Sequence, residues 1–187
     1  MIYPVTVYGD PSLRKKAVPV NKDMEGLNEI ISNMWETMYH SDGVGLAAPQ
    51  VGMSIRLFVV DASSGADEEP SLKDFKKVFI NPEISELTGE EWVMNEGCLS
   101  LPEIREDVKR PDVVRLKYLD ENFEQRDEIF SGYAGRIIQH EYDHLEGKLF
   151  IDYLSPLRKR LLRAKLHNIA SGKVQPHYRI KAPLKPL

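Results

Sequence analysis

The segment Gln139–His144 (QHEYDH) constrains the fold of this 187-residue chain more than any other feature. On an α-helix His140 and His144 lie on the same face, one turn apart, and Glu141 lies about 100° away from His140. This pattern offers two imidazole ligands to a metal ion, with a carboxylate beside them. The sequence therefore predicts a helix whose histidine face meets a further ligand from elsewhere in the chain.

The third ligand is not supplied by the usual downstream positions. A catalytic metal commonly has three protein ligands and one open position. Phe150 stands six residues after His144, where metzincin proteases have a histidine, and no glutamate follows Glu146. Cys98, the only cysteine, is the remaining soft ligand. A lone cysteine is more commonly a small buried apolar residue, but the flanking Gly97 permits close backbone approach and favours the ligand interpretation.

Apolar periodicity predicts an amphipathic helix in the first quarter of the chain. It is expected to begin after Asn21 or Asp23 and to end before Gly43, with His40 at its frayed end. The apolar residues that repeat at steps of three and four are Met24, Leu27, Ile30, Ile31, Met34 and Met38.

Two further helices are predicted, at about Tyr133–Glu146 and Pro156–Ala170. In the second helix, Ser155 is a suitable N-cap, and Pro156 fits the first helical position. Gly147 and Gly172 are expected to terminate the two helices.

Short segments rich in β-branched and aromatic residues predict strands, mostly antiparallel. Asp120-Glu121-Asn122 is expected at a hairpin tip, and the polar stretch Ser63–Ser71 is expected to be an exposed loop. The predicted strands are Leu57–Asp61, Val78–Ile80, Glu91–Met94, Val113–Leu119 and Phe123–Phe130.

Composition excludes several classes of protein. A hydrophobic fraction of 42% with 29% charged residues is ordinary for one globular domain, and a net charge of −4 does not suggest a general nucleic-acid-binding protein. One cysteine excludes an intrachain disulfide, which favours a reducing compartment. Met1–Asp10 lacks the pattern of a signal peptide, and no apolar run is long enough to span a bilayer. We therefore expect a cytoplasmic protein without membrane or DNA partners.

Three segments together are similar to the signature motifs of the peptide deformylase family. They are Gly43–Gln50 (GVGLAAPQ), Glu96–Ser100 (EGCLS) and Gln139–Gly147 (QHEYDHLEG), in the family's order. The resemblance covers roughly Met1–Ala170, and it includes Asp10-Pro11 and Asn81-Pro82. It implies an α+β fold in which mixed, mostly antiparallel strands surround a metal-bearing helix, with a C-terminal helix beyond.

The resemblance also implies an activity. Members of this family remove the formyl group from the N-terminal formylmethionine of new polypeptides, using Fe(II) natively, although Zn, Ni or Co also occupy the site. It implies that Glu141 is the general base and acid, and that the Gln50 side chain and the Leu99 backbone N–H stabilise the oxyanion. These roles agree with the ability of a divalent metal to lower the pKa of water and of donors to stabilise a developing oxyanion. The implied metal ligands are Cys98, His140 and His144.

Substrate contacts are expected around the same helix. Peptide backbone is expected to pair with edge segments near Gly45 and Glu96–Gly97, and Arg105 is either at the peptide end of the cleft or an ordinary surface arginine. Arg136, Asp143 and Gln139 share the polar side of the helix, where they support the ligands or form ion pairs. The expected walls of the methionine pocket, which are alternatively plain core, are Val44, Tyr133 and Ile137.

Two rival functions remain at this stage. One is a cysteine hydrolase in which Cys98 is the nucleophile and His140 the base, but it leaves Glu141 and His144 unexplained. The other is a catalytically silent binding module with a structural metal, although structural sites usually have four protein ligands.

The C-terminal region is basic, with nine Lys or Arg and no Asp or Glu from Tyr153 to Leu187. We expect residues 1–170 to form a single catalytic domain and residues 171–187 a flexible basic tail. Lys159, Arg160 and Arg163 share one helical stripe, helped by Lys165 and Lys173, which is either a solvated face or a weak docking site for ribosomal RNA. The expected packing positions of this helix are Leu157, Leu161, Leu162, Leu166 and Ile169.

Overall fold

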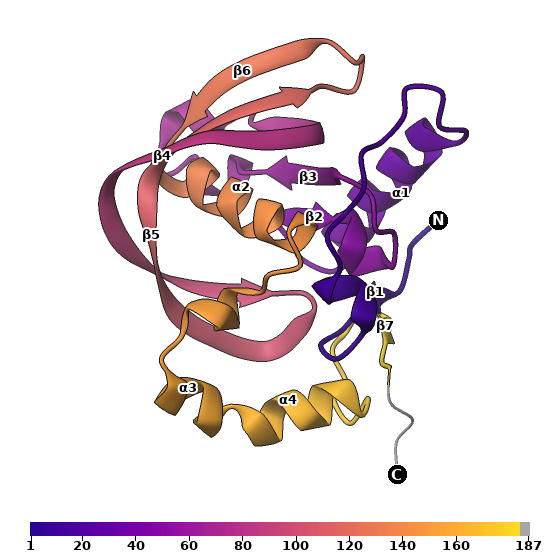
Figure 1. The fold of residues 1–187 in the computed structure, drawn as a ribbon, viewed down its shortest axis with the longest axis vertical. Helices are drawn as coiled ribbons and strands as arrows, with labels where there is room; N and C mark the ends of the chain where they lie inside the picture. The colour runs from indigo at the N-terminus through magenta and orange to yellow at the C-terminus, as the bar shows by residue number, and fades with distance from the viewer. Residues whose placement is uncertain (184–187) are drawn as a thin grey trace.

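Figure 1 shows the computed structural model, in which residues 1–183 are described. Five strands form one antiparallel sheet in the order β2-β3-β4-β5-β6, and β1 and β7 form a separate parallel pair. The sheet curves strongly, and helix α2 lies in its hollow (Figure 1). The α+β architecture predicted from the sequence is confirmed.

The helices and strands have the following bounds. The α-helices are α1 (Leu27–His40), α2 (Gly132–Leu145), α3 (Pro156–Leu161) and α4 (Arg163–Ala170). The strands are β1 (Val5–Thr6), β2 (Gly45–Ala47), β3 (Leu57–Asp61), β4 (Lys76–Cys98), β5 (Leu101–Leu119), β6 (Gln125–Phe130) and β7 (Ile180–Lys181). Short 3-10 helices are Pro11–Arg14, Ala48–Val51, Ser63–Gly65, Pro70–Leu72 and Phe150–Tyr153.

Strands β4 and β5 are much longer than the separate short strands expected from the sequence, with 23 and 19 residues. Proline and glycine interrupt the pattern at Pro82 and Gly89, and these positions coincide with register shifts rather than with strand ends. A bulge lets a strand bend without leaving its partner. The hairpin consequently curves around α2 and carries Cys98 back to the helix.

Helix α2 is held by apolar packing on the concave face of the sheet. Ile138 and Leu145 are fully buried against aromatic residues that include Phe58 and Phe79, whose ring centroids lie 4.7 Å apart. Burying a side chain of this size stabilises the fold by about 1.5 to 3 kcal/mol. Gly147, with φ of +70°, ends the helix as expected, because glycine adopts this conformation without steric cost.

The structure differs from the sequence predictions at one helix start, in one loop and in the C-terminal helix. Helix α1 begins at Leu27 because the chain forms turns up to Gly26, which has φ of +75°. The predicted Ser63–Ser71 loop contains two 3-10 turns. The Pro156–Ala170 helix is divided at Leu162, and Leu157 and Leu161 are 66% and 61% exposed rather than packed.

The segment predicted to be a flexible tail, from residue 171 onward, packs against the rest of the protein through β7 and its flanking residues. Ile180 and Lys181 pair in parallel with Val5 and Thr6, and Tyr178 is buried. Among the described residues β1 pairs with no strand other than β7, so its backbone groups are available for this pairing. The last part of the predicted tail, 184–187, lies outside the described residues.

Candidate metal centre

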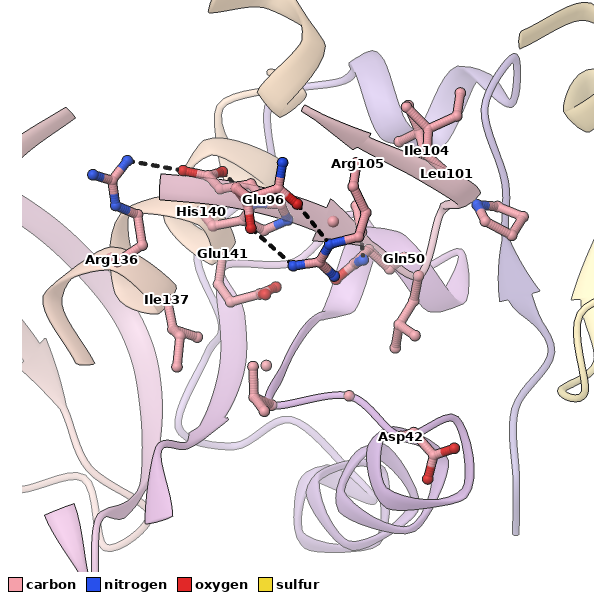
Figure 2. Close-up of a pocket in the computed structure, with 18 of the residues that line it drawn as sticks. Asp42, Gln50, Glu96, Leu101, Ile104, Arg105, Arg136, Ile137, His140 and Glu141 are labelled. Carbon is pink, nitrogen blue, oxygen red and sulfur yellow. Dashed lines mark hydrogen bonds and ion pairs between the residues drawn. The ribbon is translucent and has the colours of Figure 1, made fainter. Parts of the chain in front are cut away.

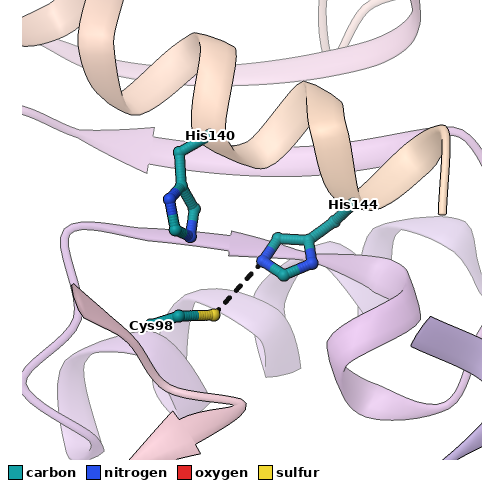
Figure 3. A group of neighbouring side chains, drawn as sticks. All are labelled: Cys98, His140 and His144. Carbon is teal, nitrogen blue, oxygen red and sulfur yellow. Dashed lines mark hydrogen bonds between the residues drawn. The ribbon is translucent and has the colours of Figure 1, made fainter. Parts of the chain in front are cut away.

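Helix α2 and the β4–β5 turn bring three metal-competent side chains together. His140 and His144 project from one face of α2 toward Cys98, as Figure 3 shows. The Cys98 Sγ lies 3.3 Å from His144 Nε2, and one ligand atom from each of the three residues lies within 4.8 Å of the others. Phe150, at the position where a metzincin histidine would stand, instead stacks on the His140 ring.

The local sequence explains why Cys98 reaches the helix. Cys98 pairs with Leu101, so Leu99 and Ser100 form the two-residue turn of the long hairpin. A Cβ on Gly97 would lie 2.7 Å from Arg105 Nη1, so glycine permits the Arg105 side chain to cross the strand beside the cysteine. Cys98 is partly exposed rather than wholly buried, which is compatible with a ligand that faces a cleft.

A buried carboxylate fixes the orientation of the first histidine. Glu96 Oε2 lies 3.0 Å from His140 Nδ1, and the same carboxylate accepts hydrogen bonds from Arg110 at 2.7 Å and Arg136 at 3.1 Å. Burial would raise the pKa of Glu96, but His140 and Arg110 outweigh it and hold that pKa well below its usual range, so Glu96 is ionised. With Nδ1 held by a carboxylate, His140 presents Nε2 to the group of ligands.

The chemistry of this group suits a cation. Within residues 1–183, the Nδ1 atom of His144 is buried without a hydrogen-bond partner. Burial and the neighbouring His140 lower the pKa of His144, whereas Cys98 and Glu96 outweigh burial and raise that of His140. The sulfur of Cys98 and one nitrogen of each imidazole are the groups that would face a bound cation. A thiolate with two neutral imidazoles is a donor set that binds borderline transition metals.

Glu141 lies beside the cluster but is not part of the ligand group. It is 4% exposed, and its Oε2 has no hydrogen-bond partner among the described residues. Burial raises the pKa of Glu141 to about 7, and opposite charges nearby only partly offset this. A Cβ on Gly45 would lie 2.5 Å from Glu141 Oε1, so only glycine leaves room for this carboxylate.

Gln50 contacts the cluster from the 3-10 helix Ala48–Val51. Its Oε1 accepts from the Ala47 N–H at 2.8 Å, which fixes the amide. Its Nε2 consequently points toward Cys98 Sγ and Ser100 Oγ, each 3.4 Å away. A buried amide donor held in this way is oriented before any ligand arrives.

A cleft of about 410 Å³ opens over these side chains. Figure 2 shows Ile137 and Glu141 reaching into it from α2, with Gln50 across from them. Arg105 also lines the cleft, although its guanidinium is folded back onto Asn95 by hydrogen bonds of 2.9 Å and 2.8 Å. The other predicted substrate residues on the cleft wall are Val44, Gly45, Glu96, Gly97 and Tyr133.

The polar residues that the sequence left undecided on α2 form ion pairs or hydrogen bonds. Arg136 contacts Glu96, and Asp143 accepts from Arg110 Nη1 at 2.6 Å. Gln139 donates to the Pro111 carbonyl at 2.9 Å. These contacts attach α2 to the β4–β5 hairpin that carries Cys98.

Sequence reasoning missed two residues and assigned one incompletely. Arg110 was not identified, because nothing in its local sequence indicates that it is buried beside two carboxylates. Glu96 was expected to contact substrate through its backbone, while its side chain orients His140. Its position two residues before Cys98 was the available signal. Tyr178, which lines the cleft from the C-terminal segment, had been placed in a mobile tail.

A family model and relatives of similar sequence agree on one family. The family model described as polypeptide deformylase matches residues 2–160. A peptide deformylase of Christiangramia forsetii is 53% identical, covering 98% of this chain and 97% of its own length. One from Flavobacterium johnsoniae is 51% identical, covering 97% and 96% respectively.

Solved structures agree with this result. The crystal structure of a Legionella pneumophila peptide deformylase superposes with a TM-score of 0.81 at 39% identity, covering 92% of this chain and 98% of that one. The Thermotoga maritima enzyme gives a TM-score of 0.75 at 47% identity, covering 83% and 99%. Separately, no helix in the described part of the chain has the length and apolar character needed to cross a bilayer.

Proposed function

This chain belongs to the polypeptide deformylase family, a family of metal-dependent hydrolases, and we propose that it releases formate from the N-terminus of formylmethionyl nascent polypeptides. The observation that supports this most directly is the position of Glu141, a buried carboxylate without a ligand role, beside the Cys98, His140 and His144 group at the base of the cleft. The two rival functions leave that carboxylate without a role.

In this proposal Cys98, His140 and His144 hold the metal. When bound, a divalent metal supplies Lewis-acid polarisation and lowers the pKa of water toward neutrality. Glu141 takes the proton from the attacking water and then gives it to the leaving amine. A carboxyl pKa of about 7 suits both steps, because the group exchanges its proton readily near neutral pH.

Gln50 and Leu99 stabilise the negative charge that develops on the formyl oxygen. The Gln50 Nε2 is already directed at the ligand group by the bond between its Oε1 and Ala47. Leu99 is the first residue of the two-residue turn, so it is not paired between β4 and β5 and its N–H is available to the substrate. Loss of one such donor typically costs about 2.7 to 4 kcal/mol of transition-state stabilisation.

The methionine side chain is proposed to occupy the part of the cleft lined by Val44, Tyr133 and Ile137. Strand β2 is an edge strand, so the peptide backbone can extend the sheet near Gly45. Opposite it, Gly97 and the backbone of Glu96 border the peptide, and Arg105 faces its distal end. This arrangement recognises the first residue and the backbone, which suits substrates of varied sequence.

We propose Fe(II) as the native metal, with Zn, Ni or Co as alternatives, because thiolate and imidazole ligands suit these borderline ions. The enzyme is proposed to act in a bacterial-type cytoplasm, where formylated chains are made. Residues 1–170 are proposed to form the single catalytic domain, against which the segment that follows packs as far as β7.

The decisive experiment measures formate release from a formyl-Met-Ala-Ser peptide by protein purified without oxygen, with the metal content determined on the same sample. Activity that disappears on chelation and returns with Fe(II) supports the proposal. Activity that survives complete metal removal would instead indicate the cysteine hydrolase. A metal-loaded protein that releases no formate would indicate a binding module.

A weak ribosome contact through the basic C-terminal helices is proposed as a second property. Lys159, Arg160, Arg163 and Lys165 are all exposed on α3 and α4. Phosphate contacts weaken as salt rises, so co-sedimentation with ribosomes should be lost at high salt and in a variant with Lys159, Arg160 and Arg163 changed to glutamate. Formate release from the free peptide should be unchanged. Equal co-sedimentation of parent and variant at low salt would mean that these residues only form a solvated face.

A further inference from the structure

The C-terminal segment that follows α4 returns to the edge of the cleft. Strand β7 pairs with β1, with the Val5 N–H donating to the Arg179 carbonyl at 2.8 Å, and Figure 1 shows the two strands side by side. Val174 and Ile180 pack against the apolar cluster that includes Leu101 and Ile104 of β5. This segment is therefore anchored on both sides of Tyr178.

Tyr178 contacts the turn that follows Cys98. Its hydroxyl donates to the Leu99 carbonyl oxygen at 2.9 Å, and its side chain is 9% exposed on the wall of the cleft. The neighbouring His177 lies 3.2 Å from Asp42, which is also on the cleft wall. The segment thus spans from the cysteine turn to the loop that precedes β2.

The turn has three separate anchors. Tyr8 donates its N–H to the Ser100 carbonyl at 2.9 Å, and Gln50 contacts the Ser100 hydroxyl. Neither of these contacts holds the Leu99 carbonyl, which lies beside the cleft. Tyr178 is the residue that holds it, because its hydroxyl donates the hydrogen bond to that oxygen.

We propose that Tyr178 is a positioning residue for the reaction, which keeps the Leu99 N–H directed at the developing oxyanion by fixing the next peptide group of the turn. Because the strands hold both ends of this turn, rotation of the Leu99–Ser100 peptide requires a compensating rotation of the Cys98–Leu99 peptide, which carries the Leu99 N–H. Without the Tyr178 hydroxyl, the Leu99 carbonyl would take its hydrogen bond from water or from the substrate backbone. The proposal rests on the proposed function, because it assigns Tyr178 a part in the same reaction.

The test compares Tyr178→Phe with the parent in formate release, because phenylalanine keeps the ring and removes only the hydroxyl. The matched control is Tyr3→Phe, which also removes a bonded hydroxyl but does not line the cleft; Tyr3 accepts from Asn33 at 3.1 Å. We expect kcat of Tyr178→Phe to fall about fivefold to thirtyfold, the effect of losing one hydrogen bond's contribution. KM and metal content should stay within about twofold, as expected when an interaction acts mainly in the transition state.

The pH profile separates positioning from proton transfer. Burial keeps the pKa of Tyr178 above its ordinary value, so the hydroxyl remains a donor throughout the assay range. Tyr178→Phe should therefore lower kcat by the same factor at every pH, and a shifted profile would overturn the proposal.

Tyr178→Ala controls for packing. If Tyr178→Phe has parental kcat while Tyr178→Ala is impaired, the ring matters only for packing and the proposal fails. A rise in KM alone would also overturn it, because it would indicate substrate contact without an effect on the turn. A parent protein that releases no formate would refute the proposed function instead, so the two failures are distinguishable.

Discussion

The Oε2 atom of Glu96 lies 3.0 Å from the Nδ1 atom of His140, although 44 residues separate them in the chain. Arg110 and Arg136 neutralise this carboxylate, and Arg110 also pairs with Asp143 on α2. The ion-pair network connects β4, β5 and α2 directly behind the ligand group. It fixes the direction in which His140 presents its second nitrogen.

Replacing Glu96 with glutamine should weaken metal binding by about 10- to 100-fold, the usual effect of removing a carboxylate that orients a histidine ligand. The free energy of unfolding should also fall, by up to about 3 to 5 kcal/mol, because the buried Arg136 loses its ion-pair partner and Arg110 keeps only Asp143. Competition with a chelator and thermal unfolding measure the two effects. The control is Glu106→Gln, which removes a carboxylate paired with Arg158 but not with a histidine; equal metal loss in both variants would contradict the orienting role.

Glu141→Ala should keep its metal but lose activity by about 100- to 10,000-fold, the range expected for a general acid and base. Metal analysis and formate release on the same preparation test this directly. Glu141→Gln provides a matched control for volume, since it retains the shape packed against Gly45 while removing the titrating group. Near-parental turnover in either variant would exclude Glu141 from proton transfer.

Cys98→Ala should lose most of its metal affinity, because two histidines alone form a poor site. We expect purified variant protein to contain little metal and to show no activity. His167→Ala is a suitable control, since that exposed histidine on α4 lies outside the ligand group. Full metal occupancy of Cys98→Ala would require a third ligand other than the cysteine.

The iron form should lose activity in air or peroxide, whereas a zinc-substituted form should be slower but longer-lived. Fe(II) and its thiolate ligand are both oxidisable, while Zn has no redox chemistry. Activity is followed over time for both forms in air and under nitrogen. Equal decay of the two forms in air would argue against iron oxidation as the cause.

Stability should depend on pH through the Asp152–Arg14 pair. Burial alone would raise the pKa of Asp152, but hydrogen bonds from Arg14 and the Leu149 N–H outweigh it and lower the pKa. The ionised carboxylate thus stabilises the fold above its ordinary pKa, and this contribution disappears as pH falls through the lower folded-state value. Asp152→Asn should melt below the parent at pH 7, with the difference shrinking below about pH 4. The control is Asp67→Asn, at an exposed position, which should melt at the parent's temperature both at pH 7 and below about pH 4. A difference between Asp152→Asn and the parent that does not change with pH would contradict the linkage.

The candidate ligands and the fold class could be predicted because their signals are local or repeated. The His140 and His144 spacing requires one helical face, and Gly147 marks the end of that helix. The long β4 and β5 strands could not be predicted, because Pro82 and Gly89 look like strand ends until a partner strand absorbs the bulges. The exposure of Leu157 and Leu161 on α3 could not be predicted either, because an apolar residue is buried only where the folded chain provides a surface to pack against.

By itself the sequence determined which side chains can carry the chemistry: one cysteine, two histidines at a helical spacing, and a glutamate beside them. Only the tertiary structure decided how they are held. The contacts of Glu96 with Arg110, and of Tyr178 with Leu99, depend on strand register and on the docking of segments 14 and 79 residues apart. Helical spacing is set by backbone geometry within a few residues, whereas these contacts follow from which apolar surfaces pack together across the whole chain.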